Sequence, residues 1–471
     1  MQTHCNQEWF EFHPLAKRDV RSRFDGGTIT SDAGGLLLRE VEKRTGIVWQ
    51  FASCFTDHRE PGRVEHSVKE LVAQRVFALA LGYEDLNDHD QLREDPLLAV
   101  LAEKADPLGE SRVRERDRGK ALAGKSTLNR LELTKAEVQD GERYKKIVID
   151  TEAVDRLLVK VFLEAHAVPP AEIVLDLDAT DDPVHGNQEG RFFHGYYGHY
   201  CYLPLYIFCG DFLLGARLRP SNIDASAGSR EELERIVAQI RQAWPEVKIT
   251  IRGDSGFCRE ELTAWCEANG VAYVLGLGKN ERLKAEMVAE LEQAATEYTA
   301  TGRAARVFKE FTYQTRQSWS RARRVVGKAE HLEKGSNPRF VVTSLVAETW
   351  EARRLYEELY CARGEMENRI KEQLSLFADR TSTAFLRSNQ TRLYFSSVAY
   401  LLMEALRRLG LKQTELAEAQ CVTIRLKLLK IGALIRITVR KVWVSLAGGY
   451  PHQDLFAQVY AELRAAPLSV G

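Results

Sequence analysis

Residues 172–180, EIVLDLDAT, alternate apolar and acidic side chains, and this alternation restricts the possible folds more than any other feature of the chain. Side chains of an extended strand point to opposite faces in turn, so one face carries three apolar residues: Ile173, Leu175 and Leu177. Asp176 and Asp178 share the other face at the carboxyl end of the strand, where ligand sites lie in α/β sheets. The segment therefore predicts either a functional site or a strand that runs out into a solvated acidic turn.

The surrounding patterns predict a mixed α/β fold. Apolar residues recur at helical spacing between about 63 and 133, where Ser126 is expected to cap one of the helices. A further helix is expected at about 142–167, before Pro169 and Pro170. The segments after these prolines become strand-like, with an amphipathic helix at 229–244 between them, and a strong helix is expected at about 349–376. Five regions follow: a mostly helical N-terminal region (1–168), the first part of an α/β core (169–280), a β-rich insertion (281–346), the second, helical part of the core (347–412) and a C-terminal basic region (413–471).

Composition excludes several classes of protein. The formal net charge of −1 excludes a uniformly basic protein but not local basic surfaces. No apolar run reaches the length of a membrane span, and the N-terminus lacks the basic-then-apolar layout of a secretion signal. The eight cysteines include no C-x-x-C pair, which favours free thiols in a reducing compartment. These features predict a cytoplasmic protein.

Asp254 has a setting similar to that of Asp178. It directly follows the strand-like segment KITIRG (248–253), in which Arg252 would lie on the same face as Asp254. An ordinary Asx-type turn after a strand is the alternative interpretation. Taken alone, this aspartate is compatible with both a site and a turn.

Four residues of the segment 359–373 form a helical stripe: Tyr360, Arg363, Glu367 and Lys371. At about 100° per residue they fall within an arc of roughly 80°. The stripe joins a carboxylate to groups that bind phosphate, because arginine can grip a phosphate bidentately and lysine offers a point charge. The alternative is a solvated helix face with ion pairs between residues four apart.

Together the strand-end aspartates and the helical glutamate form a set of hard oxygen ligands, separated by 76 and 113 residues along the chain. Such ligands suit Mg²⁺ or Mn²⁺ rather than zinc. Two ions held about 4 Å apart by carboxylates can activate a water or a 3′-hydroxyl and stabilise the leaving oxygen of a phosphodiester. The residues therefore indicate metal-dependent phosphodiester chemistry.

Several motifs together resemble one known family. They are FDGGTITSDAGGLLLRE (24–40), DLDATDDPVHG (176–186), LRPSN (218–222), IRGDSGF (251–257) and YCARGEMENRIKE (360–372). In this order they resemble the DDE transposases of bacterial insertion sequences, most closely the group numbered 1380, over about residues 20–460. That group is related to transposases with a Y-x2-R-x3-E-x6-K signature.

The resemblance implies an RNase-H-like core, with a mixed sheet and an Asp-Asp-Glu triad that binds two Mg²⁺ ions, for which Mn²⁺ can substitute. The second aspartate falls on Asp254 and the glutamate on Glu367. Asp178 matches the Asp-x-Thr pattern of the first aspartate, and Asp176 is the alternative. Asp181 and Asp182 are assigned to the following turn.

The same resemblance assigns DNA contacts to the helical stripe. Tyr360 and Arg363 would contact phosphates of the transposon end. The lysine of the signature should stand at position 374, where this chain has Leu374. Lys371, one turn from Glu367, is the substitute.

The predicted insertion contains a basic stretch, residues 303–339, with ten Lys or Arg and three Asp or Glu. Its densest part supplies four candidate DNA-binding residues: Trp319, Arg321, Arg323 and Arg324. Basic side chains beside an aromatic ring suit phosphate neutralisation and stacking on an unpaired base. The resemblance supports this role, because related transposases carry a β-rich insertion that holds DNA near the cleaved end. A core position for Trp319 is the alternative.

Two further segments are candidates for DNA contacts. Residues 422–441 carry six basic side chains and no acidic one, which predicts either a second phosphate-binding surface or a strand pair with a solvated basic face. The helix start at 122–132 offers Lys125, Asn129 and Arg130 for recognition of terminal repeats. Helix N-termini bind phosphates, and Asn and Arg read base edges.

The leading interpretation is a metal-dependent transposase that acts on double-stranded DNA in the bacterial cytoplasm, at the nucleoid. It would bind terminal inverted repeats as a homodimer, cleave there and join the 3′-ends to target DNA by cut and paste. One alternative is an RNase-H-like nuclease or resolvase without strand transfer, and another is a domesticated DNA-binding protein without catalysis. Paired carboxylates of a glycosidase would not explain the helical stripe or the basic insertion.

Overall fold

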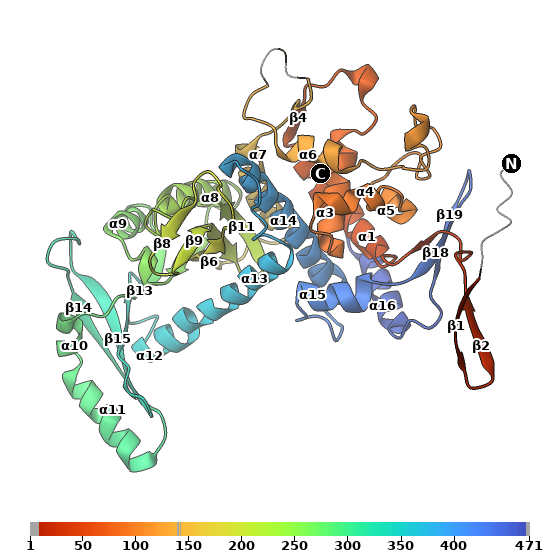
Figure 1. Ribbon diagram of the computed structural model, residues 1–471. Coiled ribbons are helices and arrows are strands. Elements are labelled where there is room, and N and C mark those ends of the chain that lie inside the picture. The colour runs from red at the N-terminus through yellow and green to blue at the C-terminus, as the bar shows by residue number, and fades with distance from the viewer. Residues whose placement is uncertain (1–8, 139–140, 142, 468–471) are drawn as a thin grey trace. The chain divides into compact units, whose positions relative to one another are not determined.

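The computed structural model describes residues 9–138, 141 and 143–467, so the outermost ends of the predicted N-terminal and C-terminal regions lie outside the described residues. The chain divides into two compact units (Figure 1). Unit 1 comprises residues 1–52, 59–131 and 405–471, and unit 2 comprises residues 53–58 and 132–404. The two ends of the chain thus belong to one unit, whereas the sequence patterns separate them.

Unit 1 is mostly helical. Its α-helices are α1 (Gly35–Thr45), α2 (Ile47–Ala52), α3 (Val68–Leu81), α4 (His89–Leu92), α5 (Pro96–Leu101), α6 (Lys125–Glu132), α15 (Cys421–Ile424) and α16 (Gln453–Ala465). Short 3₁₀ or π turns are η1 (Pro61–Arg63), η2 (Leu86–Asp88), η3 (Glu115–Asp117), η7 (Arg407–Leu411) and η8 (Arg425–Leu429). The predicted helical periodicity is confirmed in α3, which starts at a capping box made by Ser67 and Glu70. Helix α6 begins at Lys125, one residue before the predicted cap Ser126.

Strands from both ends of the chain join in unit 1. The strands of this unit are β1 (Phe10–Leu15), β2 (Arg18–Ser22), β3 (Ile29–Thr30), β18 (Ala433–Ile437) and β19 (Val442–Leu446). Strands β1 and β2 pair with each other, and β18 pairs antiparallel with both β19 and β3. The strand-like character predicted for the C-terminal basic region is therefore confirmed in β18 and β19.

Unit 2 contains a nine-stranded mixed sheet with the order β11-β10-β6-β12-β13-β17-β15-β14, and β16 pairs with β15. Its strands are β6 (Glu172–Ala179), β10 (Leu205–Cys209), β11 (Phe212–Arg217), β12 (Lys248–Gly253), β13 (Ala272–Leu277), β14 (Ala305–Tyr313), β15 (Arg323–Leu332), β16 (Gly335–Ser336) and β17 (Arg339–Thr343). Strand β6 pairs antiparallel with β10 and parallel with β12, and β12 pairs parallel with β13. The carboxyl ends of β6 and β12 therefore lie at the same edge of the sheet.

Helices cover the two faces of this sheet. The α-helices of unit 2 are α7 (Thr151–Glu164), α8 (Ser229–Ala243), α9 (Glu260–Ala268), α10 (Glu281–Ala285), α11 (Val288–Thr301), α12 (Ala352–Arg354), α13 (Gly364–Ser375) and α14 (Leu386–Leu406). The predicted apolar face of β6 enters the main core with α8. On the opposite face, Val274 and Val341 pack against Leu355 and Leu359 of η5 (Leu355–Tyr360). Burial of each such side chain contributes about 1.5–3 kcal/mol, so both layers hold the sheet in place.

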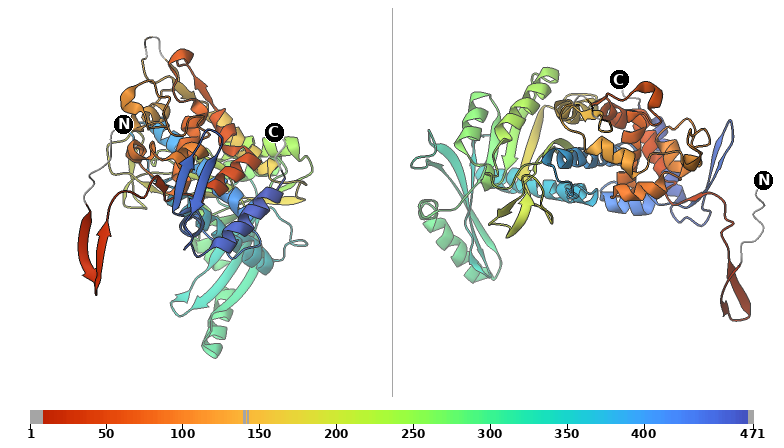
Figure 2. Two further views of the ribbon diagram at one scale, coloured as in Figure 1. Left: turned by 90° about the vertical axis from the view of Figure 1, so that its right-hand side faces the viewer. Right: turned by 45° about the horizontal axis from the view of Figure 1, so that its top comes forward.

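Residues 281–346 continue the sheet of the core. Strand β17 pairs antiparallel with β13, and β15 pairs with both β17 and β14. The strand-like prediction for 281–301 is wrong, because α10 and α11 occupy that stretch, and Figure 2 shows α11 beside β14 and β15. The buried Met287 and Ala294 attach these helices to the core, and a Cβ atom on Gly327 of β15 would lie 2.5 Å from the Met287 sulfur.

The remaining elements of unit 2 are short. They are β4 (Phe55–Asp57), β5 (Ile147–Ile149), β7 (Asp182–Pro183), β8 (Phe192–His194), β9 (His199–Tyr202), η4 (Ser255–Phe257) and η6 (Cys361–Arg363). Strand β5 ends the stretch that the sequence predicts as the start of a helix at 142, so α7 is shorter than expected. Among the described residues, no helix combines the length and the apolar character that crossing a membrane requires.

Candidate active site

The carboxyl ends of β6 and β12 bring the two predicted aspartate motifs together. In the parallel register Gly253 lies opposite Leu177, so Asp254 follows β12 beside Asp178 of β6. Asp178 also lies opposite Tyr206 of the antiparallel neighbour β10. The sheet therefore places both carboxylates at one edge, as the strand patterns predict.

Asp176 is engaged within the protein. Its carboxylate accepts hydrogen bonds from Nε and Nη2 of Arg252, at 2.5 and 2.7 Å, and the exposed fractions of the two residues are 4% and 6%. Arg252 also donates from Nη1 to the Leu359 carbonyl oxygen at 2.5 Å. Both oxygens of Asp176 are thus used to fasten β6 to β12, and Arg252 fastens this pair to η5.

Asp178 has a different environment two residues further along β6. Its side chain is 18% exposed, and its nearest cation is Arg363, whose Nη1 lies 3.6 Å from Oδ1. Burial raises the pKa of Asp178 to about 6; Arg363 opposes this shift, while the negative charges of Asp254 and Glu367 add to it. Three carboxylates that are distant in sequence therefore interact electrostatically at this edge of the sheet.

Asp254 ends β12 and begins the short turn η4. Its Oδ1 atom accepts a hydrogen bond from the Gly256 backbone N–H at 2.8 Å. The Asx-type turn considered for this aspartate is therefore present. Because the turn uses Oδ1, Oδ2 is the oxygen that remains for a ligand.

The helical stripe is not part of one regular helix. A π-helical segment, η5, ends at Tyr360 and a 3₁₀ turn, η6, ends at Arg363, whereas Glu367 and Lys371 lie in α13. The prediction of a regular helix from 349 to 376 is therefore wrong in this part. Single π turns inside helices occur often at functional sites, and here η5 is followed along the chain by η6, which ends at Arg363, and by α13, which carries Glu367.

Arg363 joins the helix to the strand edge. Its Nη2 atom donates to Oε1 of Glu367 at 3.1 Å, while Nη1 faces Asp178. Glu367 keeps half of its side chain exposed. Lys371 is exposed one turn further on and has no hydrogen bond or ion pair with another described residue. The structure thus brings Arg363 and Glu367 to the aspartates and leaves Lys371 at the surface beside them.

Tyr360 reaches the same edge across β13. A Cβ atom on Gly276 would lie 2.7 Å from the Tyr360 hydroxyl and 2.8 Å from the Ser255 nitrogen, so a residue larger than glycine would displace the ring. Burial raises the pKa of Tyr360, and the charge of Asp254 adds to this shift. The tyrosine hydroxyl therefore lies near Asp254.

Sequence reasoning missed three features of this region. Arg252 shares a face with Asp254 in the sequence pattern, but its pairing with Asp176 depends on the register of β6 and β12. Gly276 carries a signal, because a glycine inside a strand often marks a close approach of another chain segment. Asp182 does not belong to a solvated turn: it is buried in β7 and accepts from the Thr381 hydroxyl at 2.9 Å, and burial raises its pKa to about 8.

The three carboxylates suit a divalent cation by their chemistry. Among the described residues, no three His, Cys, Asp or Glu side chains approach closely enough to form a ready metal site. Arg363 instead lies between Asp178 and Glu367. Asp178 is buried and is repelled by the negative charges of Asp254 and Glu367. A hard cation such as Mg²⁺ or Mn²⁺, which prefers carboxylate oxygens, would stabilise the ionised form of Asp178. The residues therefore fit the predicted metal, provided that Arg363 moves aside.

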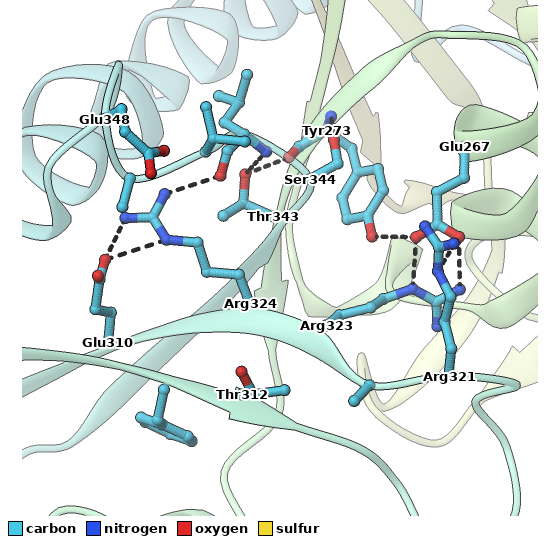
Figure 3. Close-up of a pocket in the computed structure, with 15 residues that line it drawn as sticks. Glu267, Tyr273, Glu310, Thr312, Arg321, Arg323, Arg324, Thr343, Ser344 and Glu348 are labelled. Carbon is cyan, nitrogen blue, oxygen red and sulfur yellow. Dashed lines mark hydrogen bonds and ion pairs between the residues drawn. The ribbon is translucent and has the colours of Figure 1, made fainter.

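The arginines predicted to bind DNA in the insertion are paired with carboxylates (Figure 3). Arg323 is buried and its guanidinium contacts Glu260 at 2.6 Å and Glu267 at 2.8 Å. Arg321 contacts Glu267 at 3.0 Å, and Arg324 contacts Glu310 at 2.5 Å. The three arginines, Glu267 and Glu310 line a pocket of about 710 Å³. The pairing argues against DNA binding by Arg323, because its charge is neutralised inside the protein.

Trp319 is a core residue in this structure. It is 6% exposed and its ring packs edge-on against Tyr313 at 5.9 Å, with the Arg323 guanidinium 5.3 Å from its centroid. A nucleobase cannot reach a ring whose surface is covered in this way. The alternative considered from the sequence, a core tryptophan, therefore describes Trp319, and its predicted stacking on a base is not supported.

The predicted contacts at the start of α6 are also occupied from within. The Lys125 backbone N–H donates to Oδ1 of Asp90 at 3.1 Å, and its Nζ lies 3.2 Å from Oδ2 of the same residue. Asn129 and Arg130 follow on the helix and are half-buried. Because Asp90 already fills the place of an anion at this helix start, the geometry argues against phosphate binding there.

Comparison with known proteins gives one family and one structural likeness. The family model described as "Transposase DDE domain group 1" matches residues 12–468. A search of curated proteins found no match. Among solved structures, a match is the cryo-EM structure of the piggyBac transposase synaptic complex with hairpin DNA, at 12% identity and a TM-score of 0.40, covering 85% of this chain and 80% of that chain.

Proposed function

Since the chain belongs to the transposase DDE domain group 1 family, we propose that it is the DNA transposase of an insertion sequence, of the group numbered 1380. The observation that carries the proposal is that Asp178, Asp254 and Glu367 lie at one edge of the sheet, where the charges of Asp254 and Glu367 add to the raised pKa of Asp178. The substrate would be double-stranded DNA with terminal inverted repeats, and the product would be target DNA joined to the 3′-ends.

The strand order supports an RNase-H-like core. Strands β11, β10 and β6 form an antiparallel meander, and β12 and β13 then join it in parallel through crossovers that contain α8 and α9. The predicted triad residues stand on the first strand, after the fourth strand and on a later helix of this arrangement.

Asp178 rather than Asp176 is the proposed first aspartate. Both oxygens of Asp176 accept hydrogen bonds from Arg252 in the interior, whereas Asp178 faces Arg363, Asp254 and Glu367. A buried, fully bonded carboxylate gives up a large interaction energy when it changes partner. Asp176 is therefore proposed as a positioning residue that fixes the register of β6 and β12.

The remaining roles follow from the same geometry. Asp178, Asp254 and Glu367 would hold two Mg²⁺ or Mn²⁺ ions, which when bound activate a water or 3′-hydroxyl and stabilise the leaving oxygen. Arg363 would release Asp178 and Glu367 and turn its planar guanidinium to a DNA phosphate. Tyr360, held over Gly276, and the exposed Lys371 would contact neighbouring phosphates.

A DNA assay with defined ends tests this function. The substrate is DNA that carries the flanking ends of the element, incubated with a target plasmid, the purified protein and Mg²⁺ or Mn²⁺. We expect cleavage at the ends and joined products, and we expect Asp254→Asn and Glu367→Gln to abolish both while leaving DNA binding intact. Near wild-type cleavage by either variant would exclude the assigned triad.

Two alternatives give different products in the same assay. A nuclease or resolvase without strand transfer would cleave the ends but would form no joined product. A domesticated DNA-binding protein would bind the ends without cleaving, which is disfavoured because all three acids of the predicted triad are present in their motifs. Light scattering of the DNA complex then tests the expected homodimer, which two ends require. We further expect the protein to act in the bacterial cytoplasm, where the nucleoid lies.

A further inference from the structure

The hairpin formed by β18 and β19 in unit 1 carries positive charge that the fold does not neutralise. From residue 419 to residue 453 the chain contains six Lys or Arg and no Asp or Glu. Two of the six have structural partners: Arg425 donates to the Ala80 carbonyl oxygen at 2.9 Å, and Lys430 pairs with Asp32 at 2.5 Å. The other four are exposed and have no ion pair with a described residue: Lys427, Arg436, Arg440 and Lys441.

Three of these cations gather at the free end of the hairpin. Arg436 lies opposite Trp443 in the antiparallel register, on the face turned away from the buried Ala433 and Ile435. The Arg436 guanidinium and the Lys441 ammonium lie 5.8 and 5.2 Å from the centre of the Trp443 ring. The arrangement is a basic patch held around one half-exposed ring.

The tip of the hairpin is ordered by its own hydrogen bonds. The Thr438 backbone N–H donates to the Lys441 carbonyl oxygen at 2.8 Å, and the Thr438 hydroxyl accepts from the Lys441 N–H at 3.1 Å. Arg440 lies within this closed turn and is exposed. The turn therefore presents Arg440 and Lys441 at a fixed place beyond the ends of the strands.

The base of the hairpin is attached firmly to unit 1. Strand β18 pairs with β3 at Ala433 and Leu434, and the Ile435 N–H donates to the Thr28 carbonyl oxygen at 2.8 Å. A Cβ atom on Gly34 would lie 2.1 Å from the Leu428 carbonyl oxygen, so the two chain ends pack without a gap there. A fixed base reduces the conformational entropy lost when the cations bind a partner.

We propose that this hairpin is a DNA-binding element in which Arg436, Arg440 and Lys441 contact phosphates of duplex DNA. Duplex DNA carries a dense row of negative charge, and binding of exposed cations to it releases counterions. A two-stranded β-ribbon also has the width that the major groove of B-DNA admits. The proposal deepens the proposed transposase function, since it names the surface that holds the duplex, and it concerns unit 1 alone.

The test measures how DNA affinity depends on salt. The full-length protein is titrated with a labelled short duplex between about 50 and 200 mM salt, as wild type and as the triple variant Arg436→Gln/Arg440→Gln/Lys441→Gln. We expect the affinity of the triple variant to fall about 10- to 100-fold, and its slope of log K against log salt to become shallower by about 3, close to 0.9 for each lost phosphate contact. Arg436→Lys/Arg440→Lys should retain the wild-type slope.

A matched variant separates the hairpin from net charge. Lys17→Gln/Arg114→Gln/Arg118→Gln removes three exposed cations of the same unit, and we expect it to keep the wild-type slope. An unchanged slope in the hairpin variant, or an equal change in the matched variant, would overturn the proposal. Binding of the hairpin triple variant to phosphatidylserine vesicles is measured as well. If that variant loses vesicle binding but keeps wild-type DNA binding, the hairpin binds a membrane surface and the proposal is overturned.

The result does not depend on the catalytic assignment. Asp254→Asn removes a proposed metal ligand in unit 2 and should bind the duplex with the wild-type slope. If cleavage fails in every variant but the hairpin slope changes as expected, the DNA contact stands and the proposed chemistry fails. If cleavage proceeds and the slope does not change, the chemistry stands and the hairpin proposal fails.

Discussion

Two basic regions of this chain use their cations in opposite ways. In the insertion, Arg321, Arg323 and Arg324 each contact a carboxylate at 3.0 Å or less. On the hairpin of β18 and β19, Arg436 and Lys441 share only the Trp443 ring. Both regions are strand pairs with a run of basic residues, so their sequences predict DNA binding for both. The structure distinguishes them, because acidic side chains lie beside the arginines of the insertion but not beside the cations of the hairpin.

The difference arises because charge in a folded protein is balanced in space. The acids that neutralise Arg323, Glu260 and Glu267, belong to α9 and stand 63 and 56 residues earlier in the chain. A count of charges within 303–339 therefore finds an excess that the fold removes. No such partner reaches the exposed cations of the hairpin among the described residues, and charge left open in this way is available to a ligand.

Strand β6 repeats the comparison on a smaller scale. Asp176 is bonded to Arg252 through both oxygens, and Asp178, two residues later, lies among Asp254, Glu367 and Arg363. Burial raises the pKa of both aspartates, but Asp176 has both oxygens bonded to Arg252, whereas Asp178 faces two further carboxylates. We expect paired groups to serve stability and open groups to serve function, and four predictions test this division.

The largest expected effect separates the two aspartates of β6. Asp178→Asn should lower the rate of end cleavage by about 10³-fold or more, because a bound metal contributes several kcal/mol of transition-state stabilisation. Asp176→Asn should lower the free energy of unfolding by about 3–5 kcal/mol, because it leaves Arg252 buried without its partner. Cleavage rates and denaturant unfolding without divalent ions measure the two effects.

The stability of Asp178→Asn gives the control. The pKa of Asp178 in the folded state is raised to about 6 from 3.8, so the stability that its protonated form provides is present at low pH and is lost as the pH rises through about 6. Asparagine does not ionise, so Asp178→Asn does not lose stability in this way as the pH rises. The variant should therefore be no less stable than wild type at pH 8 without divalent ions. A strong destabilisation of Asp178→Asn would contradict the division.

The second prediction compares two tryptophans. Trp319 is 6% exposed in the core, and Trp443 is 47% exposed on the hairpin. Trp319→Ala should lower the free energy of unfolding by about 3–5 kcal/mol, whereas Trp443→Ala should change it by less than about 1 kcal/mol. Unfolding by urea measures both, and similar values for the two variants would show that exposure does not distinguish the regions.

The sequence predicts the residues of the site better than it predicts the DNA-binding surfaces. Alternation in 172–180 and the strand-like pattern before Asp254 place both aspartates at strand ends, because strand periodicity is a local property. The parallel pairing of β6 and β12 then brings the two ends to one edge of the sheet. The sequence alone does not decide between Asp176 and Asp178, because the decision depends on the partner strand, which supplies Arg252. The π turn before Arg363 could not be predicted either, because the helical periodicity used for the sequence assumes about 100° per residue, as in a regular α-helix.

The predicted DNA surfaces depended on pairings that no local pattern contains. Trp319 and Arg323 look exposed in a basic segment, but α9 and Tyr313 cover them after folding. Residues 281–301 do carry a helical period, because apolar side chains recur three or four residues apart and pack on the core: Leu283, Met287, Leu291, Ala294 and Tyr298. The strand-like interpretation of this stretch overlooked that period. The hairpin at 433–446 was predicted because strand alternation and charge there need no distant partner.

The third prediction compares a paired arginine with an open one. Arg323→Met should lower the free energy of unfolding by about 2–4 kcal/mol, somewhat below the range for fully buried pairs, because Glu260 keeps part of its exposure to solvent. Arg440→Met should change it by less than about 0.5 kcal/mol, since the side chain is exposed and has no ion pair among the described residues. If Arg440→Met destabilises the fold as much, the hairpin cation has a structural role.

The smallest expected effect concerns Arg321, the residue that tests the comparison most closely. Its side chain is 62% exposed but lies 3.0 Å from Glu267, so exposure favours DNA binding and pairing opposes it. If the ion pair with Glu267 keeps Arg321 from binding DNA, Arg321→Gln should leave the slope of log K against log salt unchanged. Arg440→Gln alone should make this slope shallower by about 0.9. A loss of DNA affinity in Arg321→Gln equal to that in Arg440→Gln would mean that a surface ion pair does not withhold an arginine from DNA, since exposed pairs contribute only about 0–1 kcal/mol.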